Sequence, residues 1–468
     1  MSAIRNNILA TRAPRTAWQA GMVTTICLLI AMVAGLWNAP SLLTGFTSQL
    51  MKLNGTSHTH LAAQSIDSGT PVPEEYQKAA VTTAQQYMTA LFNKQYSTMW
   101  SLLHPQVQAV WPSETAFTTY WQARFQGYTL QRYVLGKVHW LAHWVNPETM
   151  MAYDHVLETP ISLLLAPGQT VVAAPLAPPE DLHPQSVFQN LPFIVQKVAS
   201  QGNGGKVQWL VLDGGPADLE APILPPLQPS GTMAQVPILM YHHISDVVPP
   251  TALGKSLTVT PEAFSQQLDY LKQQGYHTIT FNQLFDALYY GGPLPQHPII
   301  LTFDDGYDDA FHFAFPILQA HGYSGMFYII TGKVGWAAYL NWKQIKTMFA
   351  GGMQIGSHTV HHVDMGSLIQ YSQDLAQGEL QKSQEVLQKR LGVVIQQFCY
   401  PSGEPFQHGS LAERQQIVAL LASDGYVGAT TDPGMTGIDQ DSMTPFVLLR
   451  IRVDGRSTLT FFMNSLPW

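Results

Sequence analysis

The stretch Leu301-Thr-Phe-Asp-Asp-Gly306 changes abruptly from apolar to acidic residues. It continues an apolar run from Pro298, whose length and composition are typical of a strand buried on both faces. Two adjacent carboxylates, Asp304 and Asp305, end this run and repel each other. A metal ion would offset the repulsion if one carboxylate ligated it and the other stayed free as a base. An isolated Asp-Asp-Gly is more often a solvated turn, so the interpretation depends on the rest of the chain.

Strand and helix signals alternate on both sides of this stretch, from about residue 236 to the C-terminus. We predict strands at 236–241, 278–281, 298–303, 325–330, 353–356, 397–400, 426–430 and 446–451. Amphipathic segments at 261–274, 309–321 and 371–390 lie between some of them. This alternation predicts an α/β fold, a distorted or incomplete (β/α) barrel of about seven units. Active sites of such barrels collect at the C-terminal ends of the strands.

A second polar cluster, His358-Thr-Val-His-His362, follows another predicted strand. His358 and His362 are four residues apart, and on one helical turn this spacing presents both imidazoles to the same side. With one carboxylate they would form a two-histidine, one-carboxylate set, which suits zinc and also non-haem iron. A lone His-x-x-x-His is more often incidental. Its combination with Asp304 and Asp305 at the strand ends of one barrel favours a metal site.

The remaining predicted strand ends add polar residues to the same mouth of the barrel. Tyr400-Pro-Ser-Gly403 ends a third strand, and Arg450 and Arg452 lie at the end of the last one. His242 and His243 end the first strand. We therefore expect these side chains to meet Asp304 and the histidine cluster at one edge of the fold.

These motifs resemble those of the polysaccharide deacetylases with a NodB homology domain, carbohydrate esterase family 4. Thr302-Phe-Asp-Asp-Gly306 and His358-Thr-Val-His-His362 resemble the first two motifs of the family. Val236-Pro-Ile-Leu-Met-Tyr-His242 and Asn341-Trp342 before Ile355-Gly-Ser357 are also similar to family sequence. The resemblance covers about residues 236–468.

The resemblance implies a metal centre and a catalytic base. Asp305, His358 and His362 would bind a divalent metal, usually Zn²⁺, with Co²⁺, Ni²⁺ and Fe²⁺ as alternatives. Asp304 would be the general base that activates the attacking water. Thr359 matches a family position that stabilises the loop between the histidines.

Two departures from the family pattern bear on the remaining roles. The usual third motif carries Arg-Pro-Pro-Tyr, whereas this chain has Cys399-Tyr-Pro-Ser-Gly403, which resembles the branch acting on extracellular poly-N-acetylglucosamine. This implies substrate binding by Tyr400, Pro401, Ser402 and Gly403. The arginine that would hold the base is absent, and we expect Arg450 or Arg452 to replace it. The usual Leu-His general acid is also missing, so His242 and His243 become candidates for the proton donor, with a structural role for them equally expected.

The region before the barrel has a different pattern. Helical periodicity begins at Glu74 and is followed by strand-like segments at 133–145, 150–157, 169–174, 193–199 and 207–212. Helices followed by strands predict an α+β domain over residues 74–215, which resembles nuclear-transport-factor-2-like domains. We interpret it as a spacer or binding module. A proline-rich linker over residues 216–235 separates it from the catalytic domain at 236–468.

The N-terminus predicts a membrane anchor. Arg5, Arg12 and Arg15 precede an uncharged apolar run over residues 20–37, which is close to the minimum length for a membrane-spanning helix. The arginines predict that residues 1–19 are cytoplasmic and that everything after the single span is extracellular. Residues 38–73 would be a flexible tether. A cleaved signal peptide, giving a secreted protein, is the alternative.

Composition narrows the classes of function. The 468 residues carry a formal charge of −8 with no cluster of lysine and arginine, which argues against nucleic-acid binding. The two cysteines, Cys27 and Cys399, are not expected to pair, because Cys27 lies in the predicted anchor. A cysteine-rich zinc site is excluded by their number, so a metal must use histidine and carboxylate.

We therefore expect a membrane-anchored hydrolase that removes N-acetyl groups from N-acetylglucosamine-containing polysaccharide at the cell surface. The alternatives are a deacetylase of peptidoglycan, chitin oligomers or O-acetyl esters. A catalytically inactive glycan-binding protein with the same fold is a further alternative, which the missing histidine and arginine motivate.

Overall fold

The computed structural model describes residues 71–126, 128–146, 151–167, 187–199, 207–215, 218, 221–223, 227, 230–432 and 437–468. The predicted anchor at 20–37, nearly all of the tether and the strand predicted at 169–174 lie outside these residues. Within the described part of the chain, no helix combines the length and the apolarity needed to cross a membrane.

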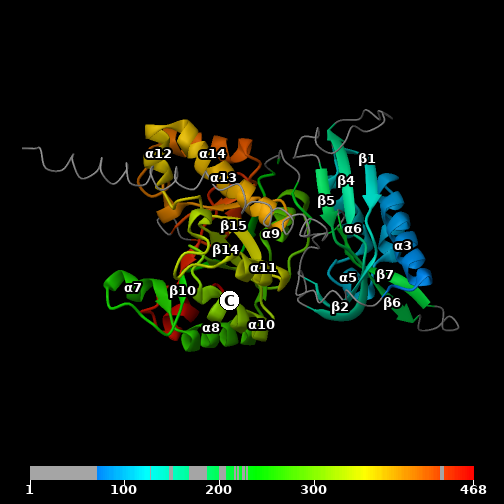
Figure 1. Cartoon of the computed structure of the whole chain (residues 1–468), viewed down its shortest axis with the longest axis horizontal. Coiled ribbons are helices and arrows are strands. Elements are labelled where there is room, and N and C mark those ends of the chain that lie inside the picture. Colours follow the sequence, from blue (N-terminus) through cyan, green and yellow to red (C-terminus); the bar gives the residue numbers. More distant parts are fainter. Residues whose placement is uncertain are drawn as a thin grey trace, which may run out of the picture. The chain divides into compact units, whose positions relative to one another are not determined.

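A sheet of parallel strands organises the C-terminal part of the chain (Figure 1). Its order is β17-β16-β15-β14-β13-β9-β19, and β12 pairs with the start of β13. Every neighbouring pair is parallel, which confirms the predicted α/β class with helical crossovers. The path is open between β17 and β19, and an isolated bridge from Thr430 to Leu448 lies there. The strands are β9 (Ile238–Tyr241), β12 (His277–Thr278), β13 (Pro298–Phe303), β14 (Met326–Ile329), β15 (Gln354–Ser357), β16 (Gln397–Cys399), β17 (Gly428–Thr430) and β19 (Ile451–Arg452).

Helices lie around these strands (Figure 1). They are α7 (Ala252–Leu257), α8 (Pro261–Gln273), α9 (Phe281–Tyr290), α10 (Phe315–His321), α11 (Trp342–Ala350), α12 (Met365–Tyr371), α13 (Gln373–Leu391), α14 (Leu411–Ser423) and α15 (Leu459–Asn464). A π-helical turn, Ala310–Ala314, precedes α10. Several predicted strands are shorter than expected. The strand predicted at 278–281 ends at Thr278, because Thr280 and Gln283 form a capping box that starts α9.

The strand β13 is the centre of this core, as its apolar sequence predicts. All six of its residues are buried. The Phe303 ring stacks against Tyr241 of β9 at 5.3 Å and against Phe327 of β14 at 4.6 Å. Burying a large apolar side chain of this kind contributes about 1.5–3 kcal/mol. The tightly packed strand therefore ends directly at Asp304 and holds the acidic pair on a rigid support.

The N-terminal part has the predicted order of helices followed by strands. Its helices are α3 (Glu74–Phe92), α4 (Tyr96–Leu102), α5 (Pro105–Gln108) and α6 (Glu114–Arg124). Antiparallel strands form one sheet in the order β2-β3-β6-β7 and a second in the order β1-β4-β5. The strands are β1 (Tyr128–Leu135), β2 (His139–Val145), β3 (Ala152–Glu158), β4 (Ile161–Pro167), β5 (Val187–Leu191), β6 (Phe193–Ala199) and β7 (Val207–Gly214). The sequence reasoning missed β4 and β5, and it merged β1 and β2 into one segment.

Candidate active site

The acidic pair leaves β13 in a sharp turn. The Asp304 amide donates to the Tyr241 carbonyl at 3.0 Å, which extends the pairing of β13 with β9 by one residue. Asp305 and Gly306 then have φ values of 74° and 71°, in the left-handed region. Aspartate tolerates this region better than most residues, and strain of this kind is typical of functional sites. Both carboxylates are nearly buried, with 4% and 7% of Asp304 and Asp305 exposed.

The two predicted histidine ligands lie in a loop after β15. The prediction of a helical turn is wrong, because Thr359 and His362 have φ values of 64° and 58°. The loop closes through Thr359, whose hydroxyl accepts a hydrogen bond from the His362 amide at 2.8 Å. Glu379 of α13 accepts from the amides of Val360 and His361, each at 2.9 Å. Side-chain acceptors therefore take the place of helical hydrogen bonds in holding the histidines together.

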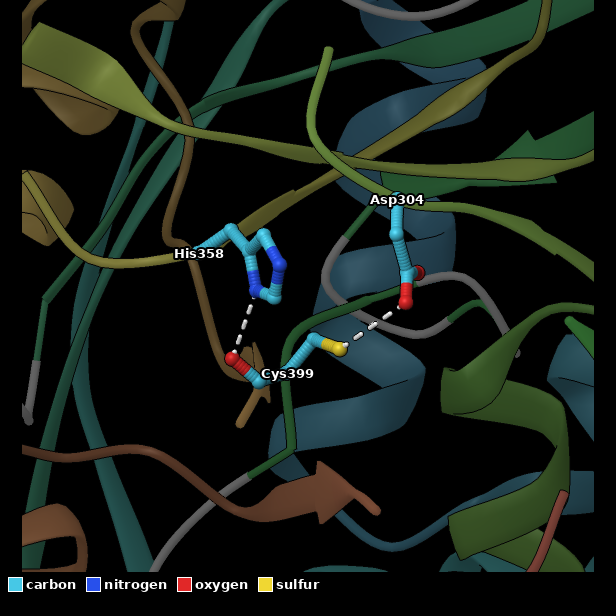
Figure 2. Close-up of side chains that lie close together, drawn as sticks. All are labelled: Asp304, His358 and Cys399. Carbon is cyan, nitrogen blue, oxygen red and sulfur yellow. Dashed lines mark hydrogen bonds between the residues drawn. The ribbon is translucent and has the colours of Figure 1, made fainter. Parts of the chain in front are cut away.

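Asp305, His358 and His362 converge as the sequence predicted. Nε2 of His358 lies 3.3 Å from Oδ1 of Asp305, and Nε2 of His362 lies 3.1 Å from the same oxygen. Nδ1 of His358 bonds to the Cys399 carbonyl at 2.8 Å and must donate there, so Nε2 is the nitrogen left to act as a ligand (Figure 2). A buried carboxylate oxygen and two imidazole nitrogens within 4.8 Å of one another fit a divalent cation.

A second triad, Asp304, His358 and Cys399, also has potential ligand atoms within 4.8 Å (Figure 2). It is the less suitable set. Both carboxylate oxygens of Asp304 are already bonded to Arg450 at 2.8 Å. The chemistry therefore favours Asp305 as the metal ligand and leaves Asp304 unligated beside it.

Arg450 holds the predicted base. Its Nη1 and Nη2 donate to Oδ1 and Oδ2 of Asp304, and only 1% of the arginine is exposed. Its Nε donates to the Thr431 carbonyl at 2.6 Å, which fixes the plane of the guanidinium. Burial alone would raise the pKa of Asp304, but the charge and hydrogen bonds of Arg450 outweigh it and lower that pKa. Of the two expected substitutes for the absent family arginine, the structure brings Arg450 to Asp304, whereas Arg452 lies 3.8 Å from Asp432.

His242 and His243 face different surroundings. His242 directly follows Tyr241, whose carbonyl accepts from the Asp304 amide, so it lies near the acidic pair. Burial lowers the pKa of His242, and the charges of Asp304 and Asp305 act in the opposite direction. The His243 ring instead stacks on Tyr307 at 3.7 Å, and its Nδ1 lies 2.6 Å from Asp309. His242 is therefore the better placed of the two for proton transfer at Asp304.

The turn predicted to bind substrate is mostly buried. Tyr400 is 1% exposed, and its hydroxyl donates to the Phe446 carbonyl at 3.1 Å. Pro401 and Gly403 are also buried, whereas Ser402 is exposed and has a φ of 55°. The Tyr400 side chain therefore has a packing role, and Ser402 is the member of the turn whose side chain faces outward. Substrate binding by this turn stays a prediction.

Sequence reasoning missed three contributors to the site. Burial and the charge of Asp305 raise the pKa of Tyr307, and the position of this tyrosine directly after Asp-Asp-Gly was an available signal. Cys399 places its Sγ 3.5 Å from Oδ2 of Asp304 and 3.3 Å from Nη2 of Arg450 (Figure 2). Glu379 lies in the middle of a polar helix face, where nothing local distinguishes it from other glutamates.

Comparisons with known proteins agree with this arrangement of motifs. Residues 291–419 match the family model described as polysaccharide deacetylase. The provisionally named polysaccharide deacetylase YxkH of Bacillus subtilis (strain 168) is 29% identical over 221 residues, which cover 47% of this chain and 72% of that protein. The poly-beta-1,6-N-acetyl-D-glucosamine N-deacetylase of Escherichia coli (strain K12) is 31% identical over 104 residues, 21% of this chain but only 15% of that protein. Among solved structures, the Streptococcus pyogenes deacetylase PplD in complex with acetate matches with a TM-score of 0.45 and 28% identity, over 50% of this chain and 100% of that chain.

Proposed function

We propose that this chain is a metal-dependent N-deacetylase of N-acetylglucosamine polymers. Its residues 291–419 match the polysaccharide deacetylase family, whose members are hydrolases acting on carbon–nitrogen bonds. The observation that carries the proposal is that two adjacent carboxylates have different partners. Asp305 faces the imidazole nitrogens of His358 and His362, whereas Asp304 is held by Arg450 and remains free of ligands. A pure glycan-binding protein would have no use for a separate, oriented base.

The residues can be given complementary roles. Asp305, His358 and His362 would hold the cation, which supplies Lewis acidity that lowers the pKa of water and polarises the acetamide carbonyl. Asp304 takes the proton of the attacking water. Its lowered pKa keeps it ionised, and Arg450 fixes the direction of its lone pairs.

His242 is the proposed proton donor to the departing sugar amine. It lies in the electrostatic field of Asp304 and Asp305, and burial lowers its pKa, so its imidazolium would give up a proton readily. Of the two candidates, His243 is engaged with Asp309 and Tyr307 instead. A His242→Gln variant should lose acetate release while still binding metal. Unchanged turnover in that variant would remove His242 from this role.

The proposed substrate class rests on the relatives. The Escherichia coli relative is by its name an N-deacetylase of poly-β-1,6-N-acetylglucosamine, and the Tyr-Pro-Ser-Gly turn at residues 400–403 resembles that branch. We propose that this protein acts on the same class of polymer and that it does so outside the cell. Residues 20–37 would be its membrane anchor, and residues 74–215 would be an NTF2-like spacer or binding module. Protease treatment of intact cells should degrade residues after 73 if this orientation is correct.

A direct assay tests the activity. Purified full-length protein is stripped of metal and reloaded with Zn²⁺, Co²⁺, Ni²⁺ or Fe²⁺, and acetate release is measured on poly-N-acetylglucosamine, peptidoglycan, chitin oligomers and an O-acetyl ester. Metal-dependent acetate release, highest on poly-N-acetylglucosamine, is the expected result. Glycan binding without turnover on any substrate, equal in wild type and Asp304→Asn, would favour the inactive binding protein instead.

A further inference from the structure

A cavity of about 610 Å³ lies beside the candidate active site, and the proposed reaction does not use it. Its polar lining includes His243, Asp308, Asp309 and His312, and Val247 and Pro249 are part of an apolar wall. Pockets for small ligands commonly have volumes of roughly 300–1,000 Å³, so the space suits one or two sugar units. A mixture of one apolar wall with several hydrogen-bonding side chains is also suited to a pyranose ring.

The cavity lies next to the turn that carries one of the proposed metal ligands. The His243 ring in the cavity wall stacks on Tyr307 at 3.7 Å. Tyr307 follows Asp305, one of the proposed metal ligands, by two residues in the chain. The Asp308 amide donates to the Ala338 carbonyl at 3.0 Å, which ties the cavity floor to the loop after β14. A glycan chain with one unit at the metal centre would therefore bring a neighbouring unit to this cavity.

The acidic side chains of the cavity wall favour a positively charged sugar unit over a neutral one. Two carboxylates line the cavity, and among the described residues its wall contains neither lysine nor arginine. Asp309 pairs with His243, with Nδ1 and Oδ2 at 2.6 Å. For the Asp308 carboxylate, no hydrogen bond or ion pair occurs within the described part of the chain. A half-buried carboxylate without a donor favours a cationic ligand over a neutral one.

We propose that this cavity is a subsite for a glucosamine unit, a sugar whose amine is already free and protonated, next to the N-acetylglucosamine unit that is deacetylated. The inference rests on the proposed function, because that reaction generates such amines along the chain. Asp308 would receive the ammonium group, and the wall formed by Val247 and Pro249 would pack against the ring. The protein would then act better on partly deacetylated chains than on fully acetylated ones.

Steady-state acetate release tests the subsite. Zinc-loaded full-length protein is given N-acetylglucosamine oligomers of equal length, either fully acetylated or with one unit deacetylated. We expect the KM of the wild type to be about three- to fivefold lower for the amine-bearing oligomers, with kcat unchanged. Asp308→Asn should abolish this difference and leave kcat on acetylated oligomers unaltered. Asp269→Asn is the matched control, because this exposed carboxylate pairs with His321 away from the cavity and should keep the preference.

A binding measurement separates failure of the subsite from failure of the proposed function. Calorimetric titration of metal-free protein with a fully deacetylated glucosamine oligomer needs no turnover. Binding that weakens with salt and weakens severalfold in Asp308→Asn supports the subsite even if no oligomer releases acetate. Equal binding by wild type and Asp308→Asn, or equal KM values for the two oligomer types in the wild type, would overturn it.

Discussion

Arg450 and Asp304 form a two-pronged ion pair in the interior, with both nitrogen–oxygen distances at 2.8 Å. The two residues are 146 positions apart in the chain: Arg450 directly precedes β19, Asp304 directly follows β13, and β9 lies between these two strands in the sheet. Each carboxylate oxygen has two acceptor sites, so a lone pair on Asp304 remains for a proton after both bonds to arginine are made. The arginine therefore orients the proposed base without consuming its capacity.

Removing this arginine should damage both folding and catalysis. Arg450→Met leaves the Asp304 carboxylate buried without its partner, and breaking a buried pair in this way costs about 3–5 kcal/mol. Urea unfolding should show a loss of this size in the free energy of unfolding. Arg452→Met is the matched control: Arg452 is 30% exposed and 3.8 Å from Asp432, so its loss should cost less than about 1 kcal/mol. Similar losses in both variants would contradict the special role of Arg450.

The histidine cluster allows a sharp test of metal binding. His362→Ala should lower the affinity for Zn²⁺ by more than about 100-fold, because it removes a proposed ligand. Even the loss of a residue that only hydrogen-bonds to a metal ligand typically lowers metal affinity by about 10–100-fold. His361→Ala is the adjacent control. Its side chain is 68% exposed and pairs with Glu379, so metal content should stay at the wild-type level. Elemental analysis after dialysis measures both, and retention of zinc by His362→Ala would exclude the assigned centre.

Neutralising each of the two adjacent carboxylates in turn should have different effects on metal binding and on activity. Asp304→Asn should keep its metal and lose about 10²- to 10⁴-fold in acetate release, because the base is gone. Asp305→Asn should lose metal and activity together, because its Oδ1 is the oxygen that faces both imidazoles. Metal content and initial rates are compared on the same preparations. If Asp304→Asn also came out metal-free, the division of roles between the two residues would be wrong.

The arrangement of the sheet and the metal set could be predicted because both depend on local patterns. The apolar run ending in Asp304 predicted a buried strand, and parallel strands bring their C-terminal ends to one edge. His358 and His362 were predicted to converge, but for the wrong reason: their loop is closed by Thr359 and Glu379 and is not helical. The spacing of the histidines was informative, whereas the backbone conformation depended on a glutamate from another element.

Long-range pairings set the limit of the prediction. The sequence left Arg450 and Arg452 as equal substitutes for the missing family arginine, because both lie at the end of the last strand. Only the register of β19 against β9, which aligns Ile451 with Leu239, decides which guanidinium reaches Asp304. The strands β4 and β5 were missed in the N-terminal part for a related reason, since their pairing links segments separated by a long connection.

The N-terminal part provides a prediction that is independent of catalysis. Glu158 ends β3 with none of its surface exposed, and within the described part of the chain neither carboxylate oxygen has a hydrogen-bond partner. Burial raises the pKa of Glu158 from 4.5 to about 8. A pKa raised in the folded state means that the folded protein keeps a proton that the unfolded chain releases. The contribution of Glu158 to stability is therefore greatest below about pH 4.5 and is lost as the pH rises through about 8.

Glu158→Gln should remove most of this pH dependence, because the amide stays neutral at every pH. We expect its free energy of unfolding to match the wild type near pH 5 and to exceed it by a few kcal/mol near pH 9, on the order of 1.4 kcal/mol for each pKa unit of the shift. Urea unfolding followed by tryptophan fluorescence at pH 5, 7 and 9 measures the difference. Glu114→Gln, at an exposed position at the start of α6, should follow the wild type throughout. If the Glu158→Gln advantage did not grow with pH, the carboxyl would be ionised in the folded protein, and a donor to it would have to exist.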